Sequence, residues 1–252
     1  MKLRAVAWDI DGTLIDSEPL HHAALVSASF RFGTDLRDLT QERFLGVHMR
    51  DVWVALCDRL PSDLEESVWL GAIEDYYVAN VDRLRPMDGA IETVRRLSDR
   101  GVPQACVSNS HRRIVDANLS ALGILRHLQF SISFDDVELG KPHPEPYRKA
   151  IRQLDLHSQA ILAVEDSGAG ARSARSAGMR VAGYRVSGLF GAEVDWRIAS
   201  LSEVFDIVDS GAAGPFCRGG VKARGQTIDV CPLDIADSRC DDLSDTGRAS
   251  KP

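Results

Sequence analysis

The chain of 252 residues lacks the cysteine and histidine patterns of disulfide-bonded or zinc-bound domains. Its five cysteines contain no C-x-x-C pair, and its seven histidines contain no H-E-x-x-H motif. An odd set of unpaired cysteines argues against a disulfide framework and predicts a reducing, cytoplasmic environment. Zinc is not expected as a cofactor.

Excess positive charge and long apolar runs are also missing. There are 30 basic against 37 acidic residues, a formal net charge of -7, so no basic stripe is available for nucleic acid or an anionic membrane. The apolar run that starts at Leu3 meets Asp9 too early for a signal peptide, and nothing later approaches the roughly 18 to 20 apolar residues of a membrane span. We expect a cytoplasmic monomer or weak homodimer, with neither nucleic acid nor membrane as a partner.

Two nucleotide-binding fingerprints are incomplete or absent. Gly168-x-Gly170 begins a G-x-G-x-x-G pattern, but Ser173 stands where the third glycine belongs. The pattern G-x-x-x-x-G-K-[ST] does not occur. Neither dinucleotide binding nor P-loop chemistry is therefore predicted.

The most informative stretch is Asp9-Ile-Asp11-Gly-Thr13, which follows the apolar residues 3–8. Those residues predict a buried strand, and its end would carry two carboxylates to the carboxyl edge of a sheet, where open α/β folds bind ligands. Two acids so close resist joint ionisation unless a cation or donors neutralise them. The pair predicts a divalent metal site, or a carboxylate and a carboxylic acid with separate roles; a solvated loop or helix cap is the alternative without chemistry.

Strands and helices alternate regularly after residue 86. Repeats of this length favour an α/β protein with a doubly wound parallel sheet, in which the polar strand ends converge on one edge. The expected strands are residues 3–8, 102–107, 129–133, 160–164 and 181–184. The expected helices are residues 90–100, 111–122 and 168–177, and one headed by Gly140-Lys141-Pro142 that runs to Leu154.

Residues 17–86 break the alternation with helical segments alone. Helical periodicity over residues 20–32, 51–60 and 62–81, the last with Ser62 as N-cap, predicts a small all-helical insertion. The expected domains are an α/β core of residues 1–16 and 87–210 and a helical cap of residues 17–86. Residues 211–252 are rich in glycine, arginine and aspartate without any period, which predicts a disordered tail.

Three further polar sites follow in order along the chain. Ser108-Asn109 ends a predicted strand, Lys141-Pro142 precedes a predicted helix, and Glu165-Asp166-Ser167 follows a later predicted strand. Together with Asp9-x-Asp11-Gly-Thr13 they match the ordered motif set of the haloacid dehalogenase superfamily. Residues 3–210 resemble its phosphatase branch with a small helical cap, of the sugar-phosphatase and β-phosphoglucomutase type. The resemblance implies a Rossmann-like core and a Mg²⁺ cofactor.

The two aspartates of the first motif suit different steps of phosphoryl transfer. The reaction needs a nucleophile, neutralised phosphoryl oxygens and a proton for the leaving alcohol. Asp9 fits the nucleophile, because attack by its carboxylate gives an aspartyl phosphate. The resemblance implies that Asp11 protonates the leaving oxygen and then activates water, a role that demands a pKa raised toward neutrality.

The later motifs supply candidate ligands for phosphate and metal. Ser108, Asn109 and Lys141 are the phosphate-binding candidates. Ser108 is alternatively a helix N-cap, a position that itself favours anions, Asn109 a cap or a contact to a sugar hydroxyl, and Lys141 a surface lysine. The metal candidates are Asp9, Asp166 and the backbone carbonyl of Asp11, with Glu165 behind them or purely structural.

A cap that closes over the catalytic edge would exclude water and read the leaving group, so specificity is expected in residues 16–86. By resemblance to sugar-phosphate members, Glu18 and His21 lie near the cap hinge, and residues 46–50 match the cap loop that faces the core. Arg50 is the candidate for a second anionic group of the substrate. A solvated arginine at a helix start is the alternative.

These motifs predict a Mg²⁺-dependent phosphatase for a small phosphorylated metabolite, a sugar phosphate or phosphosugar acid. A phosphomutase of the β-phosphoglucomutase type would use the same residues, although Thr13 stands where such mutases tend to carry valine. A dehalogenase is disfavoured because Asp11 is present. A non-catalytic binding protein is disfavoured because the acid pair and Lys141 are intact.

Overall fold

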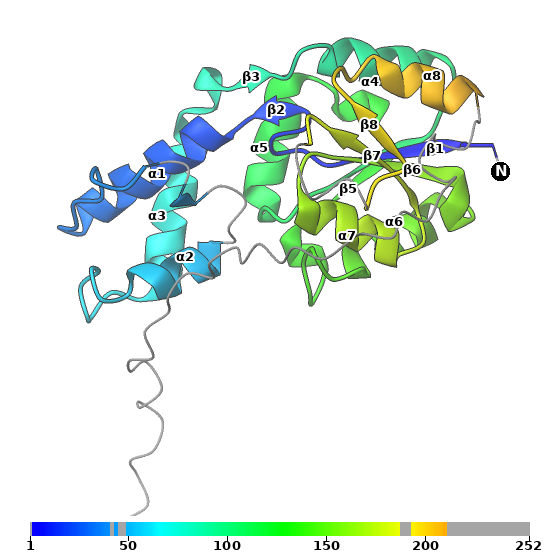
Figure 1. The fold of residues 1–252 in the computed structure, drawn as a ribbon. Coiled ribbons are helices and arrows are strands. Elements are labelled where there is room, and N and C mark those ends of the chain that lie inside the picture. Colours follow the sequence, from blue (N-terminus) through cyan, green and yellow to red (C-terminus); the bar gives the residue numbers. More distant parts are fainter. Residues whose placement is uncertain (1, 41–42, 45–48, 187–192, 211–252) are drawn as a thin grey trace, which may run out of the picture. The chain divides into compact units, whose positions relative to one another are not determined.

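The computed structural model describes residues 2–40, 43–44, 49–186 and 193–210. Its main strands are β1 (Ala5–Trp8), β4 (Gln104–Val107), β5 (Phe130–Ile132), β6 (Ile161–Glu165), β7 (Arg180–Tyr184) and β8 (Trp196–Ile198). They form one six-stranded sheet in the order β5-β4-β1-β6-β7-β8 (Figure 1). Every neighbouring pair is parallel. The α/β fold class with a parallel sheet is confirmed.

Helices connect these strands. They are α1 (Glu18–Arg31), α2 (Met49–Leu56), α3 (Glu66–Ala79), α4 (Ala90–Asp99), α5 (Arg112–Leu122), α6 (Glu145–Leu154), α7 (Gly168–Ser176) and α8 (Glu203–Ser210). Gly123 ends α5 in the left-handed conformation, as the position of a glycine after the last apolar residue predicts. In the described part of the chain no helix combines the length and the apolar character that crossing a bilayer requires.

Both faces of the sheet are covered by helices. Ala5 and Ala7 of β1 belong to an apolar cluster with residues of α6 and α7, whereas Val6 and Trp8 belong to a cluster with residues of α4, α5 and α8. Alternate residues of a strand point to opposite faces, so β1 needs apolar side chains at every position. This is why the strand reads as an unbroken apolar run, and it confirms the doubly wound arrangement.

Two elements differ from the prediction after β7. Residues 196–198 form β8 and residues 203–210 form α8, two elements that are absent from the expected strands and helices. The exposed Arg197 in the middle of β8 hides the apolar signal of this short edge strand. Asp195 fixes the start of β8, because its backbone N–H donates to the carbonyl of Val181 and its Oδ2 accepts the N–H of Val181, each at 2.8 Å.

The third helix of the insertion starts later than predicted. Its N-cap is Glu65 and not Ser62. The residues before it form a turn, in which the backbone N–H of Leu64 donates to the carbonyl of Pro61 at 3.1 Å. Ser62 lies inside this turn, so the predicted cap at this residue is wrong.

The insertion leaves and rejoins the sheet region through two short strands, β2 (Ile15–Asp16) and β3 (Arg85–Pro86), which pair antiparallel. Between them the described residues form helices and turns without a strand. The described residues fall within one compact unit, so the division into core and cap stays a prediction. The predicted tail, residues 211–252, and residues 46–48 of the predicted cap loop lie outside the described residues.

Candidate active site

The chain turns sharply after β1, and the carboxylates of Asp9 and Asp11 enter different surroundings. The backbone N–H of Asp9 continues the sheet by donating to the carbonyl of Val164 at 3.0 Å. Three backbone N–H groups, of residues 13–15, then donate to the carbonyl of Ile10. Gly12 stands in this turn at φ +80°, and a Cβ there would lie 2.1 Å from Oδ2 of Asp166. Only glycine fits, because both the conformation and the space exclude a side chain.

Lys141 is the cation of the site. Its buried ammonium group donates to Oδ1 of Asp9 and Oε1 of Glu165, each at 2.6 Å, and to the carbonyl of Val107 at 2.7 Å. Burial alone would lower the pKa of Lys141, but the two carboxylates hold it above its ordinary value. The lysine therefore stays charged, and the surface-lysine alternative is wrong.

Glu165 is a buried partner of this lysine. Its side chain is fully buried, and its Oε1 accepts from both Lys141 and the hydroxyl of Tyr147. Gly170 closes the other side, because a Cβ there would lie 1.8 Å from Oε2. These contacts show Glu165 orienting Lys141; its role as a metal ligand stays a prediction.

Asp9, Glu165 and Asp166 form a cluster of carboxylates whose oxygens lie within 4.8 Å of one another. Burial raises the pKa of Asp9 well above its usual range; Lys141 opposes the rise and the neighbouring carboxylates add to it. Burial and the nearby Glu165 raise the pKa of Asp166 to about 7. One lysine thus faces three acids, and an all-oxygen donor set with excess negative charge fits a hard divalent cation such as Mg²⁺.

Asp11 lies in a different environment, although only one residue separates it from Asp9. Its carboxylate oxygens accept from four neutral groups and from His21 when Nε2 of that ring carries hydrogen; the donors are Ser17 (2.8 Å), Asn118 (3.0 Å), Ser110 (2.9 Å), Ser108 (3.1 Å) and His21 (3.5 Å). Burial alone would raise the pKa of Asp11, but these hydrogen bonds and the charge of His21 hold it well below its ordinary value. The direction is opposite to the raised pKa predicted for a proton donor.

Ser108 and Asn109 follow β4 and use their side chains within the protein. The hydroxyl of Ser108 donates to Asp11 and accepts the backbone N–H of Ser110 at 2.9 Å. The amide of Asn109 bonds the backbone of Lys141 twice, giving Nδ2 to its carbonyl at 2.9 Å and accepting its N–H at 2.7 Å. Asn109 therefore positions the lysine, and direct phosphate contact by either residue stays a prediction.

The cap candidates separate into two groups. Glu18 starts α1 and His21 lies one turn later, where its ring stacks on Tyr77 with centroids 4.5 Å apart and reaches Asp11. Arg50 lies on α2 with Nε 3.6 Å from Glu66, and its side chain is 72% exposed. This ion pair joins Arg50 to Glu66 of α3. Substrate contact by any of the three stays a prediction.

Sequence reasoning missed several residues that contact the site. Ser110 continues the polar run after Ser108 and could have been found from that run. The others are single polar residues inside helices or loops and carry no local signal: Ser17, Tyr77, Asn118 and Tyr147.

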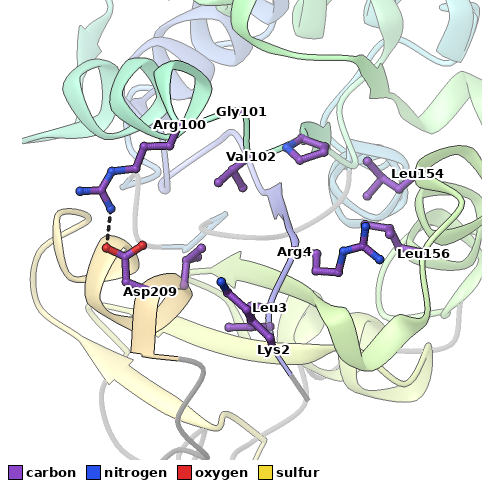
Figure 2. A pocket seen from close by; sticks show the side chains of 11 residues that line it. Lys2, Leu3, Arg4, Arg100, Gly101, Val102, Leu154, Leu156 and Asp209 are labelled. Atoms are coloured by element: carbon purple, nitrogen blue, oxygen red, sulfur yellow. Dashed lines mark hydrogen bonds and ion pairs between the residues drawn. The ribbon is translucent and has the colours of Figure 1, made fainter.

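A cavity of about 730 Å³, whose lining residues are drawn in Figure 2, contains none of these carboxylates in its walls. Its walls include Leu3 and Arg4 just before β1, and Val102 and Pro103 just before β4. Asp9 and Ser108 follow the opposite ends of the same two strands. The cavity is therefore separate from the carboxylate cluster of Asp9, Glu165 and Asp166.

Comparison with known proteins agrees with this geometry. The profile of the haloacid dehalogenase-like hydrolases matches residues 3–178. Validoxylamine A 7'-phosphate phosphatase of Streptomyces hygroscopicus subsp. limoneus is 32% identical, over 80% of this chain and 95% of its own length. Phosphoglycolate phosphatase of Pectobacterium atrosepticum is 31% identical, over 77% of this chain and 85% of its own.

A solved structure of β-phosphoglucomutase from Clostridium difficile has the same fold, with a TM-score of 0.69 and 20% identity, over 83% of this chain and 96% of that one. The family profile covers well over half of the sequence, and its matched range contains every carboxylate of the cluster together with Lys141. The chain belongs to the haloacid dehalogenase-like hydrolases, as a phosphatase of that family.

Proposed function

We propose that the protein is a Mg²⁺-dependent phosphatase that hydrolyses a small phosphorylated metabolite through an aspartyl phosphate on Asp9. The observation that carries the proposal is the placement of the Asp9 carboxylate between the Lys141 ammonium group at 2.6 Å and the acidic cluster with Glu165 and Asp166. This arrangement combines a nucleophile, a fixed cation and oxygen donors in one buried site.

In the first step an oxygen of Asp9 attacks phosphorus while the bond between phosphorus and the ester oxygen breaks. Lys141 stabilises negative charge on the phosphoryl oxygens, since its charge is fixed by its two carboxylate partners. Ser108 lies at the same sheet edge and can turn its hydroxyl from Asp11 to a phosphoryl oxygen. The product of this step is an acyl phosphate and an alcohol.

Asp11 handles the proton in both steps. It gives a proton to the leaving oxygen and then takes one from the water that attacks the acyl phosphate. The hydrogen bonds that lower its pKa must therefore be offset when substrate enters. A doubly charged phosphoryl group beside Asp11 does this, because a nearby negative charge favours the protonated carboxyl group.

Magnesium is the proposed cofactor. Asp9, Asp166 and the backbone carbonyl of Asp11 would hold it, and Glu165 supports the site through Lys141. When bound, the cation neutralises phosphoryl charge that the single lysine leaves unbalanced. The shared negative charge of the cluster and the raised pKa of Asp166 support this assignment.

We propose a sugar phosphate or phosphosugar acid as the substrate class. The two relatives support this class, because their names give small phosphorylated organic compounds, validoxylamine A 7'-phosphate and phosphoglycolate. The helical cap of residues 17–86 would close over the site and supply selectivity through Glu18, His21 and Arg50. Asn109 would contact the substrate with its second amide hydrogen.

We propose a cytoplasmic monomer or weak homodimer that uses neither nucleic acid nor membrane as a partner. Five cysteines without a C-x-x-C pair and a formal net charge of -7 support this proposal. Sedimentation of the purified protein over a range of concentrations tests the assembly state.

The function is tested with a panel of phosphorylated metabolites and an assay for released phosphate, in the presence of Mg²⁺ and of excess chelator. We expect release from small sugar phosphates or phosphosugar acids, and its loss in chelator. Undiminished turnover in chelator would contradict the metal site. Isomerisation of each sugar phosphate is followed in parallel, and rapid isomerisation with little phosphate release would identify a phosphomutase instead.

A further inference from the structure

Asn118 is a fully buried side chain on α5 whose amide connects the cap helices to Asp11. Its Nδ2 donates to Oδ1 of Asp11 at 3.0 Å, and its Oδ1 accepts the hydroxyl of Tyr77 at 2.8 Å. We propose that Tyr77 and Asn118 are positioning residues that hold the Asp11 carboxyl group in line for proton transfer to the leaving oxygen. This inference rests on the proton-transfer role of Asp11 in the proposed function.

The hydrogen bonds fix which way the Asn118 amide points. A carboxylate accepts and cannot donate when ionised, so Asp11 must face the amide nitrogen. The amide oxygen then faces Tyr77, whose hydroxyl hydrogen satisfies it. Loss of the Tyr77 hydroxyl would leave this buried oxygen without its donor, and the amide could settle in another orientation.

Tyr77 reaches the same carboxylate oxygen by a second route. Its fully buried ring stacks on the ring of His21, and Nε2 of His21 lies 3.5 Å from Oδ1 of Asp11. One side chain of α3 therefore orders two groups that bond Oδ1. Both routes begin in the helical insertion and end on the carboxyl group.

The second oxygen of Asp11 is held separately. Oδ2 accepts from Ser108 and Ser110, which follow β4. A carboxyl group bonded at both oxygens cannot rotate without breaking one set. Removing the Tyr77 set leaves Ser17 as the remaining donor to Oδ1 and leaves Ser108 and Ser110 on Oδ2. Rotation of the carboxyl group is then less restricted, so the direction of the Asp11 O–H bond is lost before its location is lost.

Misdirection of that proton affects substrates unequally. An alkoxide leaves from phosphorus only as it receives the proton of Asp11, whereas p-nitrophenolate is stable enough to leave without one. In both cases the bond from Asp9 to phosphorus forms as the bond to the ester oxygen breaks. The ratio of kcat/KM for an alkyl phosphate and an aryl phosphate therefore reports the proton transfer of the first step.

The experiment compares benzyl phosphate with p-nitrophenyl phosphate on the full-length enzyme in Mg²⁺. The variants are Tyr77→Phe and Asn118→Ala, with Asp11→Asn as the reference for a missing proton. Tyr76→Phe is the matched control, because Tyr76 is the neighbouring tyrosine of α3 and its hydroxyl accepts from Arg83 at 3.3 Å, outside this network. Both substrates are measured on the same preparation, so a partly unfolded fraction cancels from the ratio.

We expect Tyr77→Phe and Asn118→Ala to lower kcat/KM for benzyl phosphate on the order of tenfold more than for p-nitrophenyl phosphate, in the direction of Asp11→Asn. Tyr76→Phe should leave the ratio unchanged. Equal losses on both substrates, or no loss, would overturn the positioning role while Asp11→Asn still discriminates. If Asp11→Asn itself fails to discriminate, the proton-transfer role in the proposed function is wrong.

Discussion

Asp9 and Asp11 are the same residue type in one short turn, yet their surroundings push them in opposite directions. Asp9 shares its oxygen with Lys141 and faces two other carboxylates, and its pKa is raised. Asp11 is surrounded mostly by neutral hydroxyl and amide donors, and its pKa is lowered. Asp9 is buried and Asp11 partly buried, and burial would raise the pKa of both, so burial alone does not set the direction.

The difference lies in how negative charge is compensated. On the Asp9 side one lysine faces several acids, which leaves a deficit that a divalent cation can fill. On the Asp11 side hydrogen-bond donors already saturate both oxygens. Environments that separate the pKa values of two acids are a mark of divided roles in catalysis. Here the difference agrees with the proposed roles, in which the Asp9 side binds metal and phosphoryl group and Asp11 transfers a proton.

The largest expected effect is that of Asp9→Asn on turnover. An amide cannot form an acyl phosphate, so phosphate release should fall by at least about 10⁴-fold for every substrate. The fold should survive, because the amide oxygen can still accept from Lys141. Phosphate release and circular dichroism of the purified variant measure these two outcomes. Near-normal turnover would end the assignment of Asp9 as nucleophile.

Lys141→Met tests the Asp9 side through stability. The substitution leaves Asp9 and Glu165 buried without their cation, and breaking a buried ion pair from one side costs about 3 to 5 kcal/mol. Lys149→Met is the control, since Lys149 is partly exposed, pairs with Asp136 at 3.7 Å and donates to its carbonyl at 2.6 Å, and its loss should cost only about 1 kcal/mol. Urea unfolding at neutral pH gives both free energies. Equal costs would mean that the cluster does not depend on its lysine.

The catalytic edge was predictable because its residues sit in local patterns. Asp9, Ser108 and Asp166 each come just after an apolar run, and parallel strands bring such ends together. The pairing of β1 between β4 and β6 makes these three positions neighbours. A short motif and a strand end are properties of adjacent residues, so both can be recognised from the sequence alone.

The Asp11 network could not be predicted in the same way. Its donors come from three helices or their ends: Ser17 lies just before α1, Tyr77 on α3 and Asn118 on α5. These side chains come together only after the helices pack. Their spacing along the chain follows no period. The predicted direction of the Asp11 pKa shift is wrong for this reason. The shift depends on hydrogen-bond donors that lie in separate stretches of the chain. The edge strand β8 was missed because three residues with an exposed arginine give little strand signal.

Magnesium should stabilise the protein in a pH-dependent way through Asp166. Its pKa of about 7 lies above the ordinary 3.8, so the folded state holds an extra proton between those values. Without metal, the stability from this proton is full below pH 3.8 and is lost as pH rises to about 7. Because the metal requires the ionised carboxylate, Mg²⁺ should raise Tm clearly at about pH 8 and little at about pH 5.5.

Asp166→Asn provides the control for this measurement. The variant lacks the titrating group and should lose the Mg²⁺-induced rise in Tm at both pH values. A rise of equal size at the two pH values in the unmodified protein would show that Asp166 does not take part in metal binding. That result would also remove the contrast between the Asp9 cluster, which lacks positive charge, and Asp11, whose oxygens are already hydrogen-bonded.

Ser17→Ala is expected to have the smallest effect, on the Asp11 side. Ser17 occupies the N-cap position of α1 without a side-chain cap bond, because its hydroxyl donates to Asp11 at 2.8 Å. Its removal should cost about 1 kcal/mol at neutral pH and let the pKa of Asp11 rise toward its ordinary value. Because the pKa of Asp11 is lower in the folded than in the unfolded protein, its ionised form stabilises the fold above the unfolded-state pKa. This stabilisation is lost as pH falls, so the cost of Ser17→Ala should shrink below about pH 4.

Ser29→Ala separates this charge effect from the loss of any buried hydroxyl. Ser29 is a buried serine of the same helix, but its hydroxyl accepts the neutral indole N–H of Trp69 at 2.9 Å. Its cost should not change between about pH 7 and about pH 3, because neither partner titrates there. Urea unfolding of both variants at both pH values gives the comparison. If the two costs vary with pH alike, the hydroxyl of Ser17 does not stabilise an ionised Asp11, and the two aspartates are less different than their contacts indicate.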